Sequence, residues 1–302
     1  MTLNPQHPLI FDQTVLSQHR RRALKAGPET FLLERVTEDM ADRLAAVLRQ
    51  FETAAVFGTP TDAVARVLRA SGRMNRIVIA DPLVESGPSA QWKVAAREEA
   101  LPFADGSLDL VASALSLQFA NDLPGALIQI RRALRPDGLF LAAVLGGETL
   151  TELRQSFAQA EADLEGGVSP RVAPFADIRD LGALLQRAGF ALPVTDIDRV
   201  VVRYATPIAL MQDLRRMGAA NMLMDRRRVP LRRATLARML EVYGERFADP
   251  DGRLRATFDV VWLSGWVPHE SQQKPLAPGS ARMRLADALG TSERSAGEKP
   301  GN

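Results

Sequence analysis

The sequence contains no cysteine at all. Disulfides, thiolate metal sites, iron–sulfur ligation and a cysteine nucleophile are therefore excluded. Histidine is also rare, because His7, His19 and His269 are the only three, and they lie far apart in the 302 residues. A histidine metal site would need two of them to converge, so we predict no metal site.

Lysine is scarce as well, since only four of the 38 basic residues are lysines and the other 34 are arginines. Against 36 acidic residues the formal net charge is only +2. Such a balance gives no large positive field, and we predict no nucleic-acid partner.

Long apolar runs are missing too. The longest, residues 108–117 and 139–147, have the length of a strand, which predicts no transmembrane segment. Residues 1–10 show no basic stretch followed by an apolar one, so we expect no secretion signal and a cytoplasmic protein.

What is present is an alternation of short apolar runs with amphipathic helical patterns, and it begins after two helical patterns within residues 11–50. The runs predict strands at 54–57, 77–80, 92–96, 108–114, 139–145, 195–204 and 257–267. Helices are predicted at 64–70, 123–134, 150–164, 177–188, 207–217 and 231–247, with Asp122 as one N-cap and Thr149 with Glu152 as a capping box. This alternation predicts an α/β fold with a mostly parallel sheet.

The domain organisation follows from the same pattern. We expect an N-terminal helical cap over residues 1–50 and one domain over 51–285, with a helical insertion at about 205–250. The polar residues 286–302 predict a disordered tail, because they cannot bury a core.

Two residues at predicted strand ends suggest a ligand site, because open α/β sheets bind ligands beyond the carboxyl ends of their strands. Gly58 follows the first strand, where a backbone often passes close to a ligand. Asp81 ends the second strand, where a carboxylate can accept hydrogen bonds from ribose hydroxyls. A simple turn glycine and a helix-entry pair, Asp81-Pro82, are the alternatives.

A family resemblance adds to this pattern. Residues 101–111, LPFADGSLDLV, resemble a stretch found in class I S-adenosylmethionine (SAM)-dependent methyltransferases. Residues 113–124, SALSLQFANDLP, are similar to a mitochondrial complex I assembly factor and its bacterial relatives, as are segments 134–138, 146–154, 213–218 and 265–272. The resemblance covers roughly residues 10–285.

The resemblance implies a Rossmann-like fold, with a seven-stranded sheet that is parallel except for its last strand in sequence, N-terminal helices and a helical C-terminal addition. It implies SAM as the cofactor and a respiratory complex I subunit as a partner. The cofactor-binding residues would be Gly58, Asp81, Glu98, Glu99 and Leu101, with Ser113 and Leu115 at the floor of the site.

The sequence departs from the family at the cofactor. Relatives usually carry a D-x-G-x-G-x-G loop after the first strand, whereas residues 56–62 here have one glycine, Gly58, and a proline, Pro60. The acid that generally contacts adenine is replaced by Arg97, and Glu98 could substitute for it only with a shift in register. These changes predict weak SAM binding.

Other polar clusters have two interpretations each. His269 and Glu270 suggest catalysis, or His269 is a structural hydrogen-bond partner. The arginines of segment 226–233 would grip an acidic partner or form a solvated charge run. The arginines of segment 20–22 have the same alternatives, but they precede the sheet, where such folds often place a lid over the cofactor.

Three functions remain open from sequence. The first is an active methyltransferase or related SAM-using enzyme acting on a protein or small molecule. The second is a catalytically degenerate assembly or binding module. The third, implied by the resemblance, is hydroxylation of an arginine on a complex I subunit, for which the residues offer no evident iron site. The sequence assigns no catalytic residue and no acceptor, and it leaves the oligomeric state open.

Overall fold

The computed structural model describes residues 9–59, 61–83, 92–272, 286–287 and 290–292. Two compact units make up the chain, residues 1–268 and 269–302. The first unit holds the sheet and every named helix and strand.

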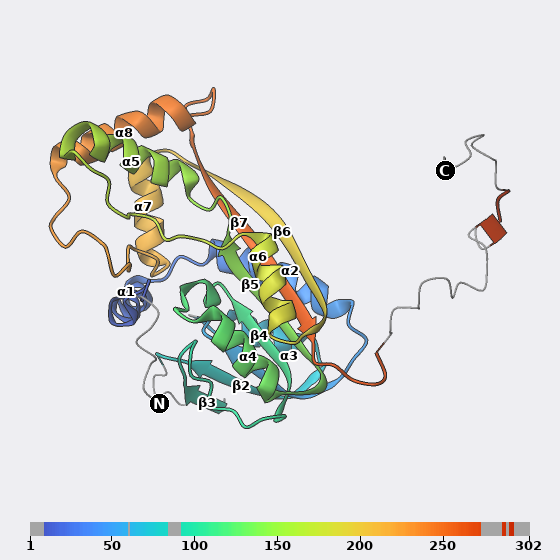
Figure 1. Cartoon of the computed structure of the whole chain (residues 1–302). Helices are drawn as coiled ribbons and strands as arrows, with labels where there is room; N and C mark the ends of the chain where they lie inside the picture. The colour runs from blue at the N-terminus through green and yellow to red at the C-terminus, as the bar shows by residue number, and fades with distance from the viewer. Residues whose placement is uncertain (1–8, 60, 84–91, 273–285, 288–289, 293–302) are drawn as a thin grey trace, which may run out of the picture. The chain divides into compact units, whose positions relative to one another are not determined.

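A seven-stranded sheet forms the centre of the first unit (Figure 1). Its strands are β1 (Phe51–Phe57), β2 (Met74–Asp81), β3 (Trp92–Ala95), β4 (Leu108–Ala114), β5 (Leu134–Gly146), β6 (Ala191–Tyr204) and β7 (Leu254–Trp266). The spatial order is β3-β2-β1-β4-β5-β7-β6, and β7 runs antiparallel to both of its neighbours. The predicted sheet, with only the last strand in sequence antiparallel, is confirmed.

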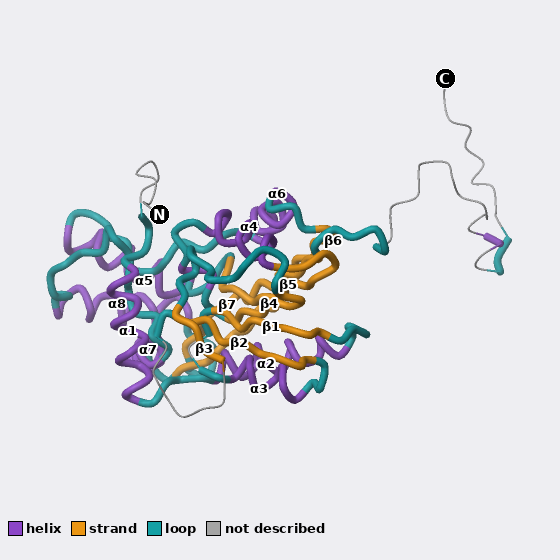
Figure 2. Tube along the Cα trace, turned by 90° about the horizontal axis from the view of Figure 1, so that it is seen from below, coloured by secondary structure: helices purple, strands orange, loops and turns teal. Residues whose placement is uncertain are grey.

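Helices cover both faces of this sheet. Figures 1 and 2 place α2 (Phe31–Ala45) and α3 (Ala63–Ala70) on one face, and α4 (Leu123–Ala133) and α6 (Ile178–Arg187) on the other. Each face buries its own apolar cluster. Val36, Met40 and Trp262 belong to the first, and Ile130, Leu185 and Phe140 to the second. Because parallel strands are covered on both sides, they read as continuous apolar runs.

A second group of helices gathers beyond one end of the strands (Figures 1 and 2). It consists of α1 (Gln13–Ala26), α5 (Thr151–Glu165), α7 (Pro207–Arg216) and α8 (Arg233–Phe247), and a short 3-10 turn, η1 (Leu117–Phe119), follows β4. Within the described part of the chain, no helix combines the length and apolarity that crossing a bilayer requires.

Of the two helix N-terminal caps predicted from sequence, one is confirmed and one is wrong. Asp122 caps α4 as predicted, because its Oδ1 accepts a hydrogen bond from Gly125 N at 2.8 Å. The capping box of Thr149 and Glu152 was wrong. Glu152 is buried and accepts hydrogen bonds from Thr257, while the Thr149 hydroxyl donates to Gly146 O. A long-range partner in β7 thus outcompetes the local cap.

Candidate functional site

Gly58 lies where β1 ends and lets the chain pass against the end of β4. Its φ of +68° is a left-handed conformation that favours glycine. A Cβ at this position would lie 2.3 Å from Ser116 Oγ, so only glycine fits. The end of β1 and the residues after β4 therefore meet here without an intervening side chain.

A buried ion pair fills the space beside Gly58. Arg20, on α1, places Nη1 3.1 Å from Glu98 Oε1 and Nη2 3.1 Å from Ser116 Oγ. The Ser116 hydroxyl donates to the same Glu98 oxygen at 2.7 Å. Arg20 is 6% exposed and Glu98 3% exposed, so these charges have left water almost completely. The guanidinium carbon also lies 5.8 Å from the centre of the Phe119 ring.

Asp81 ends β2, and the charges of Arg20 and Glu98 both affect the pKa of its carboxyl group. Its Oδ1 accepts a hydrogen bond from Leu83 N at 2.6 Å, which closes a local turn. Burial raises the pKa of Asp81 above its ordinary 3.8, against the lowering effects of the Leu83 N–H and the Arg20 guanidinium. Glu98 adds to the rise. The carboxylate is thus a turn residue and also part of the charged cluster.

Glu98 and Arg97 differ in burial, and the role of Glu98 as a substitute for the missing acid stays a prediction. Glu98 points inward and is buried, whereas the neighbouring Arg97, at the family's usual acidic position, is exposed. Thr59 is 4% exposed, and its hydroxyl has no hydrogen-bond partner among the described residues. Pro60 lies outside the described residues.

The remaining predicted site residues lie further from this cluster. Glu99 accepts hydrogen bonds from the backbone N–H groups of Asn121 and Asp122, at the start of α4. Leu101 packs against the α4–α6 side of the core. The fully buried Ser113 hydroxyl donates to Phe57 O at 2.8 Å and joins β4 to β1. Their assignment to a cofactor therefore stays a prediction.

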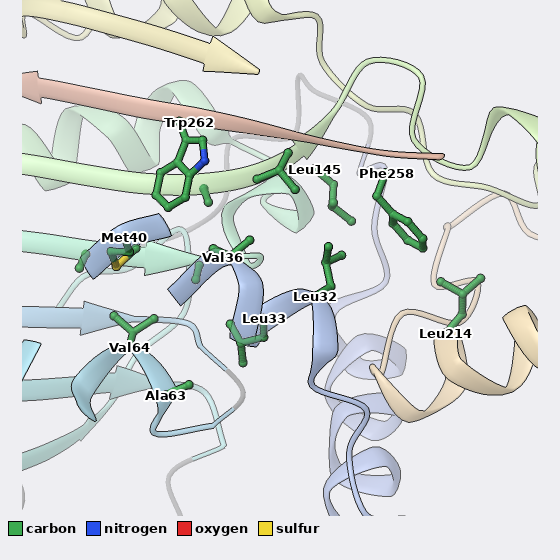
Figure 3. Close-up of a cluster of buried hydrophobic side chains, with 14 of the residues drawn as sticks. Leu32, Leu33, Val36, Met40, Ala63, Val64, Leu145, Leu214, Phe258 and Trp262 are labelled. Carbon is green, nitrogen blue, oxygen red and sulfur yellow. The ribbon is translucent and has the colours of Figure 1, made fainter. Parts of the chain in front are cut away.

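An apolar cavity of about 310 Å³ opens on the other side of Arg20. Leu115 and Leu145 line it from the ends of β4 and β5, and Figure 3 shows Leu32, Leu214 and Phe258 gathered in the same region. Leu115 and Leu150, which both line it, have φ of +54°. Left-handed leucines are strained, and such strain clusters at functional sites.

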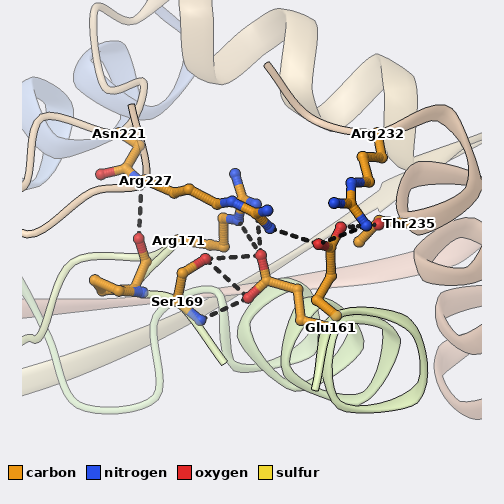
Figure 4. Close-up of polar contacts among 9 residues, drawn as sticks. Glu161, Ser169, Arg171, Asn221, Arg227, Arg232 and Thr235 are labelled. Atoms are coloured by element: carbon orange, nitrogen blue, oxygen red, sulfur yellow. Dashed lines mark hydrogen bonds and ion pairs between the residues drawn. The ribbon is translucent and has the colours of Figure 1, made fainter. Parts of the chain in front are cut away.

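Ionic contacts fix two loop segments that wall the cavity. Figure 4 shows Glu161 receiving hydrogen bonds from Ser169 and ion-pairing with Arg171, whose segment lines the cavity. Asn221 donates to Pro170 O at 2.8 Å, which joins the second segment to the first. Glu165 pairs with Arg227, so part of the 226–233 arginine run is satisfied within the chain.

The C-terminal histidine lies in the second unit of the chain. The Nδ1 of His269 is 2.7 Å from Ser271 Oγ and 3.2 Å from Ser271 N. This local turn gives His269 a structural hydrogen bond. Across the described ranges, no three His, Asp or Glu side chains lie close enough together to hold a metal ion.

Comparisons with known proteins agree with this architecture. Residues 57–142 match the methyltransferase domain family. The YcgJ protein from Bacillus subtilis superimposes with a TM-score of 0.51 at 13% identity, covering 77% of this chain and 98% of that one. Together with the sheet order, these matches define a class I methyltransferase-fold protein.

Relatives with higher sequence identity identify the family within this class. The arginine-hydroxylase NDUFAF5, mitochondrial, from Danio rerio is 38% identical and covers 92% of this chain and 89% of its own length. The human protein of that name is 37% identical over 94% of this chain and 84% of its own. A malonyl-[acyl-carrier protein] O-methyltransferase from Laribacter hongkongensis is 38% identical over 73% and 71%. The chain belongs to the family of methyltransferase-fold proteins that includes the arginine-hydroxylase NDUFAF5.

Proposed function

We propose that this protein is a SAM-dependent enzyme of the methyltransferase class, with its cofactor at the carboxyl ends of β1, β2 and β4 and its acceptor in the apolar cavity. The observation that carries the proposal is the convergence of Gly58, Glu98 and Ser116 next to that cavity. Leu115 links the two places, because it precedes Ser116 and lines the cavity.

Several residues fit the cofactor. Asp81 Oδ1 is engaged with Leu83, and its Oδ2 has no partner in the described ranges, so it can accept a hydrogen bond from a ribose hydroxyl. Gly58 keeps the β1 backbone free of a Cβ. SAM would supply an activated methyl group. The protein residues would hold the nucleoside, and the apolar cavity wall would exclude water from the acceptor.

A second candidate is the arginine-hydroxylase function named for the NDUFAF5 relatives, with a respiratory complex I subunit as the partner. The specific observation in its favour is coverage. The relatives of that name from Danio rerio and human align over more than nine-tenths of this chain, whereas the malonyl relative aligns over 73%.

One pair of measurements tests both candidates. Calorimetric titration with SAM and with S-adenosylhomocysteine measures cofactor binding, and we expect SAM to bind weakly. Co-expression with complex I subunits, followed by mass spectrometry, distinguishes an added methyl group from an added oxygen atom on an arginine. Absence of SAM binding to the wild type and to variants with an opened site would contradict the enzyme proposal and favour the binding module.

A further inference from the structure

A chain-internal cation occupies the centre of the candidate cofactor site. Arg20 contacts Glu98 and Ser116, and these two residues also lie closest to a Cβ built on Gly58. The guanidinium therefore stands at the junction of the β1 and β4 ends, where the proposed function places the cofactor.

The groups that surround Arg20 stabilise a positive charge. The Glu98 carboxylate is 3% exposed and forms its ion pair with the Arg20 guanidinium at 3.1 Å. The Ser116 hydroxyl orients Glu98, and the face of Phe119 lies within cation–π range. Burial of a carboxylate is expensive unless a cation compensates it, so this cluster requires an occupant of positive charge.

Helix α1 is held so that Arg20 reaches this cluster. Asp12 N donates to Met222 O at 2.8 Å, and the Asn121 side chain accepts hydrogen bonds from Ile10 N and Phe11 N. Gly218, with φ of +73°, lets the end of α7 approach, since a Cβ there would lie 3.0 Å from Arg20 Cα. The placement is therefore specified by contacts on both sides of the helix.

We propose that Glu98, Ser116 and Phe119 form a cation-binding subsite of the cofactor site, and that Arg20 fills it until the positively charged SAM takes its place. This inference rests on the proposed function. SAM is a sulfonium cation, whereas S-adenosylhomocysteine has a neutral sulfur. Binding of SAM thus requires Arg20 to withdraw, and the charge of the subsite selects SAM over its product.

Titration of matched variants tests the exchange. Arg20→Ala should raise the affinity for SAM by about tenfold or more, a change of roughly 1.4 kcal/mol. S-adenosylhomocysteine should gain less, because it brings no sulfonium charge. Arg21→Ala is the matched control, since Arg21 is exposed on the same helix with no partner among the described residues, and its affinity should stay at the wild-type value. Glu98→Gln added to Arg20→Ala should remove the gain.

Hydrogen exchange gives a readout that does not depend on the variants folding. Saturating SAM should speed the amide exchange of α1 in the wild-type protein, because Arg20 leaves its partners. Equal or weaker SAM binding by Arg20→Ala, or slower α1 exchange with SAM, would overturn the inference and leave the proposed function standing. Binding of N-acetyl-arginine amide, but not SAM, to Arg20→Ala would overturn it in favour of a guanidinium substrate site. If neither the wild type nor any variant binds SAM, both proposals fail.

Discussion

The two halves of the sheet differ in the length of their strands and in how they pair. The half that holds the candidate site consists of β1, β2, β3 and β4, with 7, 8, 4 and 7 residues. In it, β3 pairs only with the last residues of β2. On the other side, β5, β7 and β6 have 13, 13 and 14 residues. β7 pairs antiparallel with both neighbours, with one register shift in β6 between Ala191 and Val194. From this difference we expect substitutions in the long half mainly to lower the free energy of unfolding, and substitutions in the short half mainly to lower the affinity for SAM.

The largest effect is expected from Phe258→Ala in β7. Phe258 is fully buried and contacts Phe31 edge to face, with ring centres 6.5 Å apart. Removing a buried phenylalanine should lower the free energy of unfolding by about 3–5 kcal/mol, measured by urea denaturation. Leu164→Ala, at a position 46% exposed, is the control and should change it by less than about 0.5 kcal/mol. Similar values for the two variants would break the comparison.

Asp259→Asn should have the next largest effect. Asp259 is 1% exposed and accepts hydrogen bonds from Arg199 and from Glu148 N. Because Arg199 itself is 57% exposed, we expect a loss of roughly 2–3 kcal/mol at pH 7, less than for a fully buried pair. Asp196→Asn breaks an exposed pair with Arg43 and should cost below about 1 kcal/mol.

The effect of Asp259 should depend on pH. Burial alone would raise the pKa of Asp259, but the hydrogen bonds from Arg199 and Glu148 N outweigh it and hold the pKa below its ordinary 3.8. A lowered pKa means that the carboxylate's stabilisation is complete above 3.8 and is lost as the pH falls through the folded-state pKa. The difference between wild type and Asp259→Asn should therefore shrink when denaturation is repeated at pH 3, and a constant difference would contradict this assignment.

In the short half, Asp81→Ala should weaken SAM binding by about 1–3 kcal/mol, which is the cost of losing charge-assisted hydrogen bonds. Calorimetry in the Arg20→Ala background provides a measurable isotherm. Thermal denaturation of the same variant should show little change in stability, because Asp81 accepts a hydrogen bond only within a local turn, from Leu83 N. Unchanged affinity would show that Asp81 is a turn residue alone.

The smallest effect is expected from restoring the loop. Changing Thr59, Pro60 and Asp62 to glycine, together with Arg97→Asp, should strengthen SAM binding by about tenfold, roughly 1.4 kcal/mol. Glycines allow close backbone approach, which Thr59 obstructs with its branched side chain. Glycine at Thr61 alone serves as a control for general loop flexibility. Low-micromolar binding by the unaltered chain would show that the loop was never the limiting feature.

The fold was predictable because the spacing of apolar residues along the sequence reflects which side chains are buried. The predicted strands contain Val56, Leu110 and Phe140, which are buried, and Val78, which is half-buried because β2 has just the short β3 beyond it. Strand starts were less predictable. β5 begins at Leu134 and β6 at Ala191, ahead of the expected 139 and 195, because pairing with neighbours extends strands through turn-like residues such as Pro193.

The site was predictable in part. Gly58 and Asp81 follow from the rule that ligands lie at strand ends, and Glu98 from its place beside the missing acid. Ser116 was missed, although the same rule could have found it, since it lies just after β4. The pairing of Arg20 with Glu98 could not be derived, because 78 residues separate them and three adjacent arginines compete for the role.

The contacts that hold α1 in place also determine the order in which parts of the candidate site can form during synthesis. This helix is synthesised well before residues 222–224, yet the backbone groups of Asp12 and Ile10 hydrogen-bond to Met222 and Met224, more than two hundred residues later. Contacts of such separation close late in folding. During synthesis, Glu98 and Ser116 therefore leave the ribosome long before the segment that holds their guanidinium partner in place. Until residues 222–224 have been synthesised, Arg20 lacks these anchoring contacts, and we expect it to compete less well with SAM.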